Sequence, residues 1–213
     1  MNTLTSRSGR ALAAWTLLGL AAYALLPWYF LQQQSLWAAL PGVWGGDATA
    51  SGVVQAALQA HGRVDVSVHN VGGTIWAKPF WEYTPDEMQR EINRSLWPTL
   101  WCCREMAALM KRQGQGAIVN ISSGLATTSL AGYFPVGASK WAVRGMTRLA
   151  AKDLAGFNVR VNTVFPGAID TPSLVQSVRD NAATMMPMGR VGSSEECARV
   201  DAELQVQESS TDA

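Results

Sequence analysis

Apolar runs and helical periodicity predict a parallel α/β core in the middle of the chain. Residues Ala117 to Ile121 and Val159 to Val164 have the length and the apolar character of buried strands. A helix-like segment between them carries Lys140, so the three elements form a strand–helix–strand crossover, the unit of a parallel sheet. In such sheets functional groups gather at the carboxyl ends of the strands, which is where Ser123 and the turn at Pro166 stand.

Further periodic segments predict two helices and a third strand before this core. Residues Val53 to Ala60 have a helical pattern, and Arg63 to Val68 alternates as a strand does. Thr84 opens a Thr-Pro-Asp-Glu capping box, which predicts the start of a long helix that runs toward Lys111. Pro98 lies inside this helix and predicts a kink at that point.

A different pattern occupies the beginning of the chain. Residues 1–10 are polar, Ala11 to Leu31 is apolar and uncharged, and residues 32–52 form a glycine-rich connector. An apolar stretch of this length is typical of a membrane-spanning helix. A cleaved signal peptide or a buried helix is the alternative interpretation, and the arginines before the stretch favour export of the residues after it.

The C-terminal part predicts one more helix followed by a polar end. Ser193 opens a second capping box, Ser-Ser-Glu-Glu. The helix that it starts carries Asp201 and Glu203, and residues 205–213 form a polar tail. We therefore expect no further strand after this helix.

Composition narrows the classes of function. The 213 residues carry a net charge of +1, which indicates no basic surface for a nucleic acid. The three cysteines, Cys102, Cys103 and Cys197, have neither disulfide nor metal-ligand spacing, and His61 and His69 complete no metal cluster. We therefore expect reduced thiols, no metal and no nucleic-acid partner.

Several motifs between about Val54 and Val200 resemble the short-chain dehydrogenases/reductases, a family of single-domain Rossmann enzymes that use NAD or NADP. The motifs are His-Asn-Val-Gly at 69–72, Ser-Ser at 122–123, Ser-Lys at 139–140 and Pro-Gly-x-x-x-Thr at 166–171. Residues 69–79 are similar to benzoate-type cis-diol dehydrogenases, and residues 139–192 are similar to hydroxysteroid-type members.

The resemblance implies a role for each residue at a motif position. Ser123 is implied to hydrogen-bond the substrate oxygen, with Ser122 as the alternative, and Lys140 to bind the nicotinamide ribose. Asn93 is implied to hold a proton-relay water. The implied cofactor-binding residues are Asn70, Gly72, Lys140, Pro166, Gly167, Ile169 and Thr171.

The sequence departs from the family in ways that affect both chemistry and fold. Val136 stands where the family has its catalytic tyrosine, and valine transfers no proton; Tyr133 is the nearest phenol. The Thr-Gly-x-x-x-Gly-x-Gly turn that cradles the cofactor pyrophosphate is absent from the sequence. We therefore expect an apolar N-terminal helix followed, over residues 53–204, by an incomplete Rossmann-like domain. Its doubly wound parallel sheet lacks the first βαβ unit and the last strand.

The sequence allows three functional interpretations and does not decide whether the chain is an enzyme. The first is an impaired NAD- or NADP-dependent oxidoreductase that acts on a secondary alcohol, a cis-diol or a ketone. The second is an inactive binding or scaffold protein, and the third is a truncated or composite chain without a stable product. The implied partners are a small-molecule alcohol or ketone, a membrane, and a second copy that packs through family-type helices. The corresponding locations are membrane-associated and cytoplasmic.

Overall fold

The computed structural model describes residues 47–172 and 174–206. They divide into two compact units, and each is described by itself. The larger unit extends to Gly167 and includes residues 203–206, whereas the smaller unit consists of residues 168–202.

Several predictions for the two ends of the chain fall outside the described residues. These are the polar segment 1–10, the membrane span predicted for Ala11 to Leu31, most of the connector and the end of the tail. Among the helices of the described part, none is both long and apolar enough to cross a bilayer. Helix α2 (Asp47–His61) begins six residues before the predicted Val53, inside the predicted connector.

The larger unit is built on a parallel sheet, which confirms the predicted α/β class. Within the described residues the sheet has three strands in the order β1 (Val66–His69), β2 (Gly116–Ile121) and β3 (Val159–Val164). The register places His69 beside Asn120 and aligns the carboxyl ends of β2 and β3. All three strands therefore deliver the residues after them to the same edge of the sheet.

Strand β1 begins later than the alternating pattern predicted. Both backbone hydrogen-bonding groups of Val64 are bonded to the side chain of Gln113. The Gln113 Nε2 donates to the Val64 carbonyl at 2.8 Å, and its Oε1 accepts from the Val64 N–H at 3.2 Å. Arg63 forms an ion pair with Asp65. Bonding to β2 therefore starts after Val64: the Asp65 carbonyl accepts from the Ala117 N–H at 2.9 Å, and β1 itself begins at Val66.

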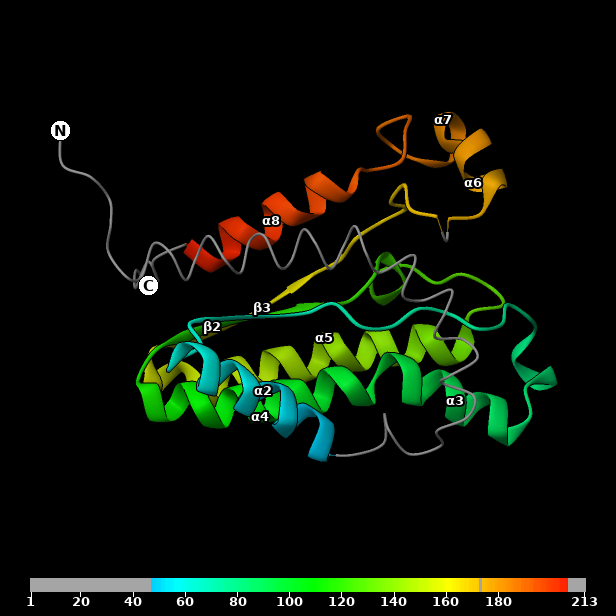
Figure 1. Ribbon diagram of the computed structural model, residues 1–213. Coiled ribbons are helices and arrows are strands. Elements are labelled where there is room, and N and C mark those ends of the chain that lie inside the picture. Colours follow the sequence, from blue (N-terminus) through cyan, green and yellow to red (C-terminus); the bar gives the residue numbers. More distant parts are fainter. Residues whose placement is uncertain (1–46, 173, 207–213) are drawn as a thin grey trace, which may run out of the picture. The chain divides into compact units, whose positions relative to one another are not determined.

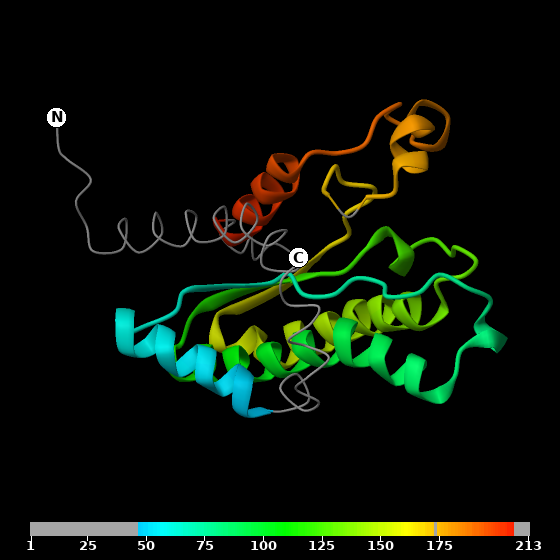
Figure 2. The same ribbon diagram turned by 45° about the vertical axis from the view of Figure 1, so that its right-hand side comes forward.

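Helices cover one face of this sheet. Figures 1 and 2 show α2, α4 (Trp97–Gln113) and α5 (Phe134–Leu154) together on that face. Met110 of α4 and Ile118 of β2 are completely buried between the layers. Burial of side chains of this size stabilises a fold by about 1.5–3 kcal/mol each, so this contact holds α4 against the sheet.

The predicted long helix is two helices, which corrects the prediction of a kink at Pro98. Helix α3 (Pro85–Ser95) ends before Leu96, which keeps a right-handed helical conformation with φ of −110° and ψ of −59°, and α4 follows with Pro98 in its first turn. Proline lacks an N–H and its ring crowds the carbonyl four residues earlier. The break therefore lies in the turn before the proline. The capping box at Thr84 is confirmed.

The smaller unit contains short helices and a loop. Ile169 forms a parallel bridge with Gly192, and the Gly192 N–H donates to the Ala168 carbonyl at 2.9 Å. The predicted capping box is present, since the Ser193 N–H donates to Glu196 at 2.8 Å and the Glu196 N–H donates to the Ser193 hydroxyl at 3.2 Å. The helices are α6 (Gln176–Asp180), α7 (Ala182–Met185) and α8 (Ser194–Val206), which continues into the larger unit.

Candidate active site

Two serines follow β2, and their hydroxyls have different hydrogen-bond partners. The Ser122 side chain is buried and its hydroxyl donates to the Lys140 carbonyl at 2.8 Å, which ties the strand end to α5. Ser123 is half-buried and its Oγ accepts from the Leu125 N–H at 3.2 Å at the start of a short 3-10 turn. Within the described residues, the Ser123 hydroxyl donates to no acceptor. Ser123 therefore retains a proton for a ligand, whereas Ser122 does not.

Lys140 is a buried lysine at the carboxyl ends of β1 and β2. Its Nζ donates to the Ile121 carbonyl at 3.1 Å and to the Val71 carbonyl at 3.4 Å. Burial disfavours the ammonium form and lowers the pKa of Lys140 to about 8. Near neutral pH this group is a fixed cation at the place where the strands end.

The turn after β1 is shaped to let Lys140 approach. Gly72 has a φ of +134°, and a Cβ at this position would lie 2.9 Å from the Lys140 Nζ. The hydroxyl of Ser95 holds the next residue, since it donates to the Gly73 carbonyl at 2.9 Å. Glycine is therefore required at position 72 for both conformation and space. Asn70 is exposed at the beginning of the turn.

Position 136 is apolar and closed. Val136 lies on α5 one turn before Lys140, and its side chain is 3% exposed. Tyr133, the nearest phenol, stands at the residue before α5, half-buried, and lines a pocket that Lys140 does not line. Valine can neither donate nor accept a proton, so the structure provides no phenol at the helix position one turn before the lysine.

The structure does not join Asn93 to Lys140. The Asn93 Oδ1 accepts from Gln89 Nε2 at 2.8 Å, one turn earlier on α3. The interruption between α3 and α4 lies at Leu96, three residues beyond Asn93.

The loop after β3 is divided between the two units. Pro166 belongs to the larger unit, where its carbonyl accepts from the Gly124 N–H at 2.8 Å and so holds the turn that follows Ser123. Ile169 and Thr171 belong to the smaller unit. There Arg179 donates to the Asp170 carboxylate at 2.7 Å and to the Thr171 carbonyl, which fixes the loop from within.

A buried histidine next to this site was not predicted as a structural centre. His69 is 5% exposed; its Nδ1 lies 2.7 Å from Asn120 Oδ1 and its Nε2 lies 2.8 Å from the Ser67 hydroxyl. Asn120 Nδ2 donates to the Thr147 hydroxyl at 2.9 Å, and that hydroxyl donates to the Val143 carbonyl. Asn120 therefore presents its oxygen to His69, so Nδ1 carries the proton and Nε2 accepts from Ser67.

The sequence contained one signal for this relay. Asn120 is a polar residue inside an otherwise apolar buried strand, and a buried amide needs partners. The partners could not be identified from the sequence because they come from β1 and α5. Burial lowers the pKa of His69 to about 4, so the side chain is neutral near pH 7.

A pocket of about 680 Å³, which no sequence pattern indicated, lies between two loops and the start of α5. Its walls come from residues 77–81, from residues 129–134 and from the first turns of α5. Leu125 also lines it, and this is the residue whose N–H donates to Ser123.

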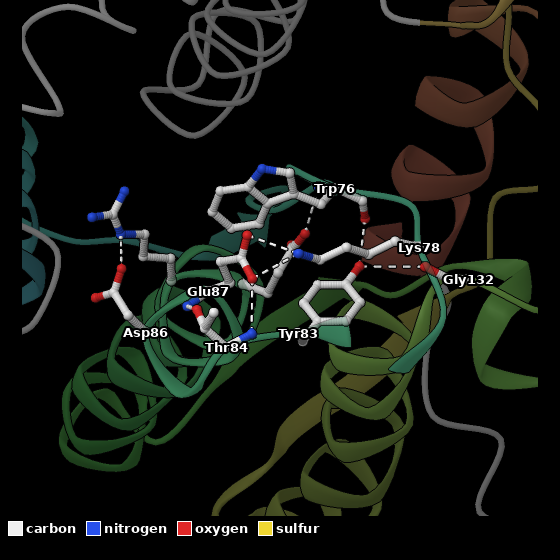
Figure 3. A network of polar contacts seen from close by, with 9 residues as sticks. Trp76, Lys78, Tyr83, Thr84, Asp86, Glu87 and Gly132 are labelled. Carbon is white, nitrogen blue, oxygen red and sulfur yellow. Dashed lines mark hydrogen bonds and ion pairs between the residues drawn. The ribbon is translucent and has the colours of Figure 1, made fainter. Parts of the chain in front are cut away.

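A polar network fixes the two loops of this pocket (Figure 3). The Gly132 carbonyl accepts from the Lys78 N–H at 3.0 Å. The Tyr83 hydroxyl donates to the Trp76 carbonyl at 2.7 Å, and it also lies 3.3 Å from the Gly132 carbonyl. The Lys78 ammonium donates to the Glu87 carboxylate at 2.7 Å and 2.8 Å. Loop 77–81 and loop 129–134 are therefore joined before any ligand arrives.

The family model described as Enoyl-(Acyl carrier protein) reductase matches residues 45–211. The 1,6-dihydroxycyclohexa-2,4-diene-1-carboxylate dehydrogenase of Pseudomonas putida is 48% identical over 118 residues, which is 55% of this chain and 43% of the relative. The 3-oxoacyl-(acyl-carrier-protein) reductase of Thermotoga maritima is 38% identical over 161 residues, which is 74% of this chain and 65% of the relative.

Two solved structures illustrate the similarity of fold. ElxO with NADP bound has a TM-score of 0.72 at 25% identity over 78% of this chain and 70% of that one. A short-chain type dehydrogenase/reductase from Mycobacterium ulcerans has a TM-score of 0.71 at 28% identity over 75% and 60% of the two chains. The chain spans about half the length of the first curated relatives that it matches. With the parallel sheet and the Ser123–Lys140 strand-end site, these matches establish that the chain belongs to the short-chain dehydrogenase/reductase family.

Proposed function

We propose that this chain is a nicotinamide-dependent oxidoreductase that interconverts a secondary alcohol and a ketone, with slow turnover. The observation that carries the proposal is the pairing of a serine with a free hydroxyl proton, Ser123, and a buried ammonium, Lys140, at one edge of a parallel sheet. Chemistry in open α/β sheets occurs at this edge. The names of the relatives favour a cyclic diol or a hydroxy compound as substrate.

Each of the two residues has a distinct task in this reaction. The Ser123 hydroxyl donates a hydrogen bond to the substrate oxygen and so orients the carbon that is oxidised or reduced. The Lys140 ammonium binds the ribose hydroxyls of the cofactor and keeps a positive charge beside the developing alkoxide. A bound nicotinamide ring supplies the hydride chemistry.

The ribose end of a nicotinamide cofactor fits the residues present. Gly72 leaves an open backbone beside the Lys140 Nζ, in a space that a Cβ would fill. The pyrophosphate end has less support, because the sequence lacks the Thr-Gly-x-x-x-Gly-x-Gly turn that would cradle it. We therefore expect weak cofactor binding, in the millimolar range of dissociation constant.

A second candidate function is a binding protein without turnover. The observation in its favour is Val136, which fills the position one turn before Lys140 with a buried apolar side chain. Proton transfer by one positioned group typically contributes about 10²- to 10⁴-fold to a rate, so its loss separates the two candidates by magnitude.

The test is the substitution Val136→Tyr in the full chain. Reduced-nicotinamide absorbance is followed with cyclic diols and secondary alcohols at millimolar NAD or NADP. We expect a measurable rate in the unaltered chain that rises by about 10²-fold in Val136→Tyr, because the phenol lies one turn from the ammonium that lowers its pKa. Val136→Leu is the matched control and should not raise the rate.

The outcomes separate the candidates. A rate confined to Val136→Tyr would assign the unaltered chain to the binding function. No rate in either protein, with the substrate bound in both, would contradict the oxidoreductase proposal.

A further inference from the structure

We propose that Arg144 positions the Ser123 hydroxyl, and with it the reacting substrate oxygen, by holding the turn after Ser123 against α5. This inference rests on the proposed function and adds a positioning residue to the same site. Arg144 lies on α5 one helical turn after Lys140, so the two side chains extend from the same face of the helix. The guanidinium bonds the backbone of the turn, so Arg144 acts on Ser123 indirectly.

The turn after Ser123 is held at its first residue by the loop after β3. The Gly124 N–H donates to the Pro166 carbonyl at 2.8 Å. Inside the turn, the Ala126 N–H donates to the Ser123 carbonyl at 2.9 Å, and the Leu125 N–H donates to the Ser123 Oγ at 3.2 Å. The position of the Ser123 hydroxyl therefore depends on the position of this turn.

Arg144 holds the last residue of the turn. Its Nη1 donates to the Ala126 carbonyl at 3.1 Å, and Ala126 is completely buried. A buried carbonyl needs a hydrogen-bond donor, and a bond from a charged donor is stronger than a bond between neutral groups. Without the guanidinium, this end of the turn would lose its hydrogen bond to α5.

Helix α5 therefore bonds the chain on both sides of Ser123. Before the serine, the Ser122 hydroxyl donates to the Lys140 carbonyl at 2.8 Å. After the serine, Arg144 donates to the Ala126 carbonyl. The helix that carries the buried ammonium of the site thus also fixes the serine that is proposed to bind the substrate oxygen.

Two aromatic rings keep the guanidinium in place. The Arg144 Cζ lies 5.3 Å from the centroid of the Trp141 ring and 5.8 Å from the centroid of the Phe165 ring. Phe165 directly precedes Pro166, whose carbonyl holds the first residue of the turn. A planar guanidinium can stack on rings and still donate hydrogen bonds in its own plane, whereas an ammonium has no such plane. Arg144 therefore joins α5, the turn after Ser123 and the loop after β3.

Amide hydrogen exchange of the full chain tests this hold on the turn without cofactor and without turnover. Arg144→Met removes the donor and keeps an unbranched apolar side chain. We expect the Gly124 and Ala126 amides to exchange about tenfold faster in this variant, because the turn opens more often when one of its two attachments is lost. The Val119 amide in the middle of β2 should keep its rate, which reports that the sheet is intact.

Two further substitutions identify the hydrogen bond as the cause. Arg144→Lys keeps a charged donor and loses the planar stack, so its exchange rates at Gly124 and Ala126 should lie between those of the unaltered chain and Arg144→Met. Arg148→Met is the matched control: Arg148 is exposed on the next turn of α5 and forms no hydrogen bond or ion pair within the described residues. It should leave both rates unchanged.

Steady-state kinetics test the link from the turn to the substrate. In the Val136→Tyr chain, Arg144→Met should raise the KM for the alcohol by about tenfold, because the hydrogen bond from Ser123 is made in the ground state as well as in the transition state. The KM for the cofactor should not change, since the Lys140 ammonium is held separately by two backbone carbonyls. A simple loss of folded enzyme would lower the apparent kcat and leave both KM values unchanged.

The outcomes decide the inference separately from the proposed function. Unchanged exchange at Gly124 and Ala126 in Arg144→Met would overturn it, and so would an equal acceleration at Val119, which would indicate a general packing role. Exchange in Arg144→Lys as fast as in Arg144→Met, or a cofactor KM that rises as much as the alcohol KM, would also overturn it. Faster exchange confined to the turn, with no turnover in any variant, would support the hold of Arg144 on the turn and reject the oxidoreductase proposal.

Discussion

His69 shows how one buried residue makes the stability of this fold depend on pH. It is held as the neutral Nδ1–H form between Ser67 and Asn120, and burial lowers its pKa to about 4. The unfolded chain has an ordinary histidine pKa near 6.5. Between these values the unfolded state binds a proton that the folded state does not, so stability falls as pH decreases through this window.

The first prediction follows from this difference. Urea unfolding of the full chain at about pH 7 and about pH 4.5 should show a loss of about 2–3 kcal/mol that is absent in His69→Asn. Asparagine can still donate to Asn120 but does not titrate. The comparison of the two proteins isolates His69 from other acid-sensitive groups.

Asp201 makes that comparison necessary. Burial raises its pKa to about 6, so the folded state holds this proton more tightly and Asp201 adds stability at acid pH that is lost as pH rises. The pH dependence of the Asp201 contribution to stability is opposite in sign to that of His69. Asp201 is present in both the unaltered chain and His69→Asn, so its contribution cancels in the comparison. Equal pH slopes in the two proteins would contradict the role given to His69.

The second prediction compares two glycines of opposite effect. Gly72→Ala should destabilise the fold by about 1–3 kcal/mol, because φ is +134° and the new Cβ would meet the Lys140 Nζ. Gly52→Ala should stabilise it by about 0.5–1 kcal/mol, since Gly52 is exposed inside α2 with open space around it. Thermal unfolding measures both changes. A loss of stability in Gly52→Ala would show that α2 does not form as described.

Among the secondary-structure elements, the features that depend on neighbouring residues were predicted, whereas those that depend on distant contacts were not. The capping boxes at Thr84 and Ser193 and the strand at Val159 needed a few neighbouring residues and are confirmed. The late start of β1 depends on Gln113, which is 49 residues from Val64 in sequence. The pocket likewise depends on a contact between two distant loops. No sequence period reports such contacts, because the partners are brought together by the whole fold.

The third prediction concerns the joint between those loops. Tyr83→Phe removes the hydroxyl that donates to the Trp76 carbonyl at 2.7 Å and also lies 3.3 Å from the Gly132 carbonyl. The change should cost about 1–2 kcal/mol of stability and speed hydrogen exchange at the Lys78 amide, which shares the Gly132 carbonyl. Tyr133→Phe is the control, because the Tyr133 hydroxyl makes no hydrogen bond within the described residues. Similar exchange in both variants would show that Tyr83 does not join the loops.

At the level of the whole molecule, charge is nearly balanced. The formal net charge is +1 and the isoelectric point calculated from the sequence is about 7.7. The parallel sheet class and several strand-end site residues were predicted from the sequence. The division at Gly167 was not, because the Pro-Gly-x-x-x-Thr motif reads as one continuous loop.

The fourth prediction is a minimum of solubility near the isoelectric point. Precipitation by polyethylene glycol should require the least polymer at about pH 7.7 and more polymer one unit to either side, because repulsion between molecules vanishes with the net charge. Added salt should reduce the difference. A steady trend in one direction across this range would contradict the balance of charge.

The shared Gly132 carbonyl has a consequence for how fast a ligand enters the pocket. One acceptor holds the Lys78 amide of one wall, the Tyr83 hydroxyl and, through the chain, the segment that leads into α5 (Figure 3). These contacts tie the two walls together, so we expect the pocket to keep one shape before and after encounter. Stopped-flow traces should be single exponentials whose rate rises linearly with ligand concentration. A plateau would indicate a slow closing step.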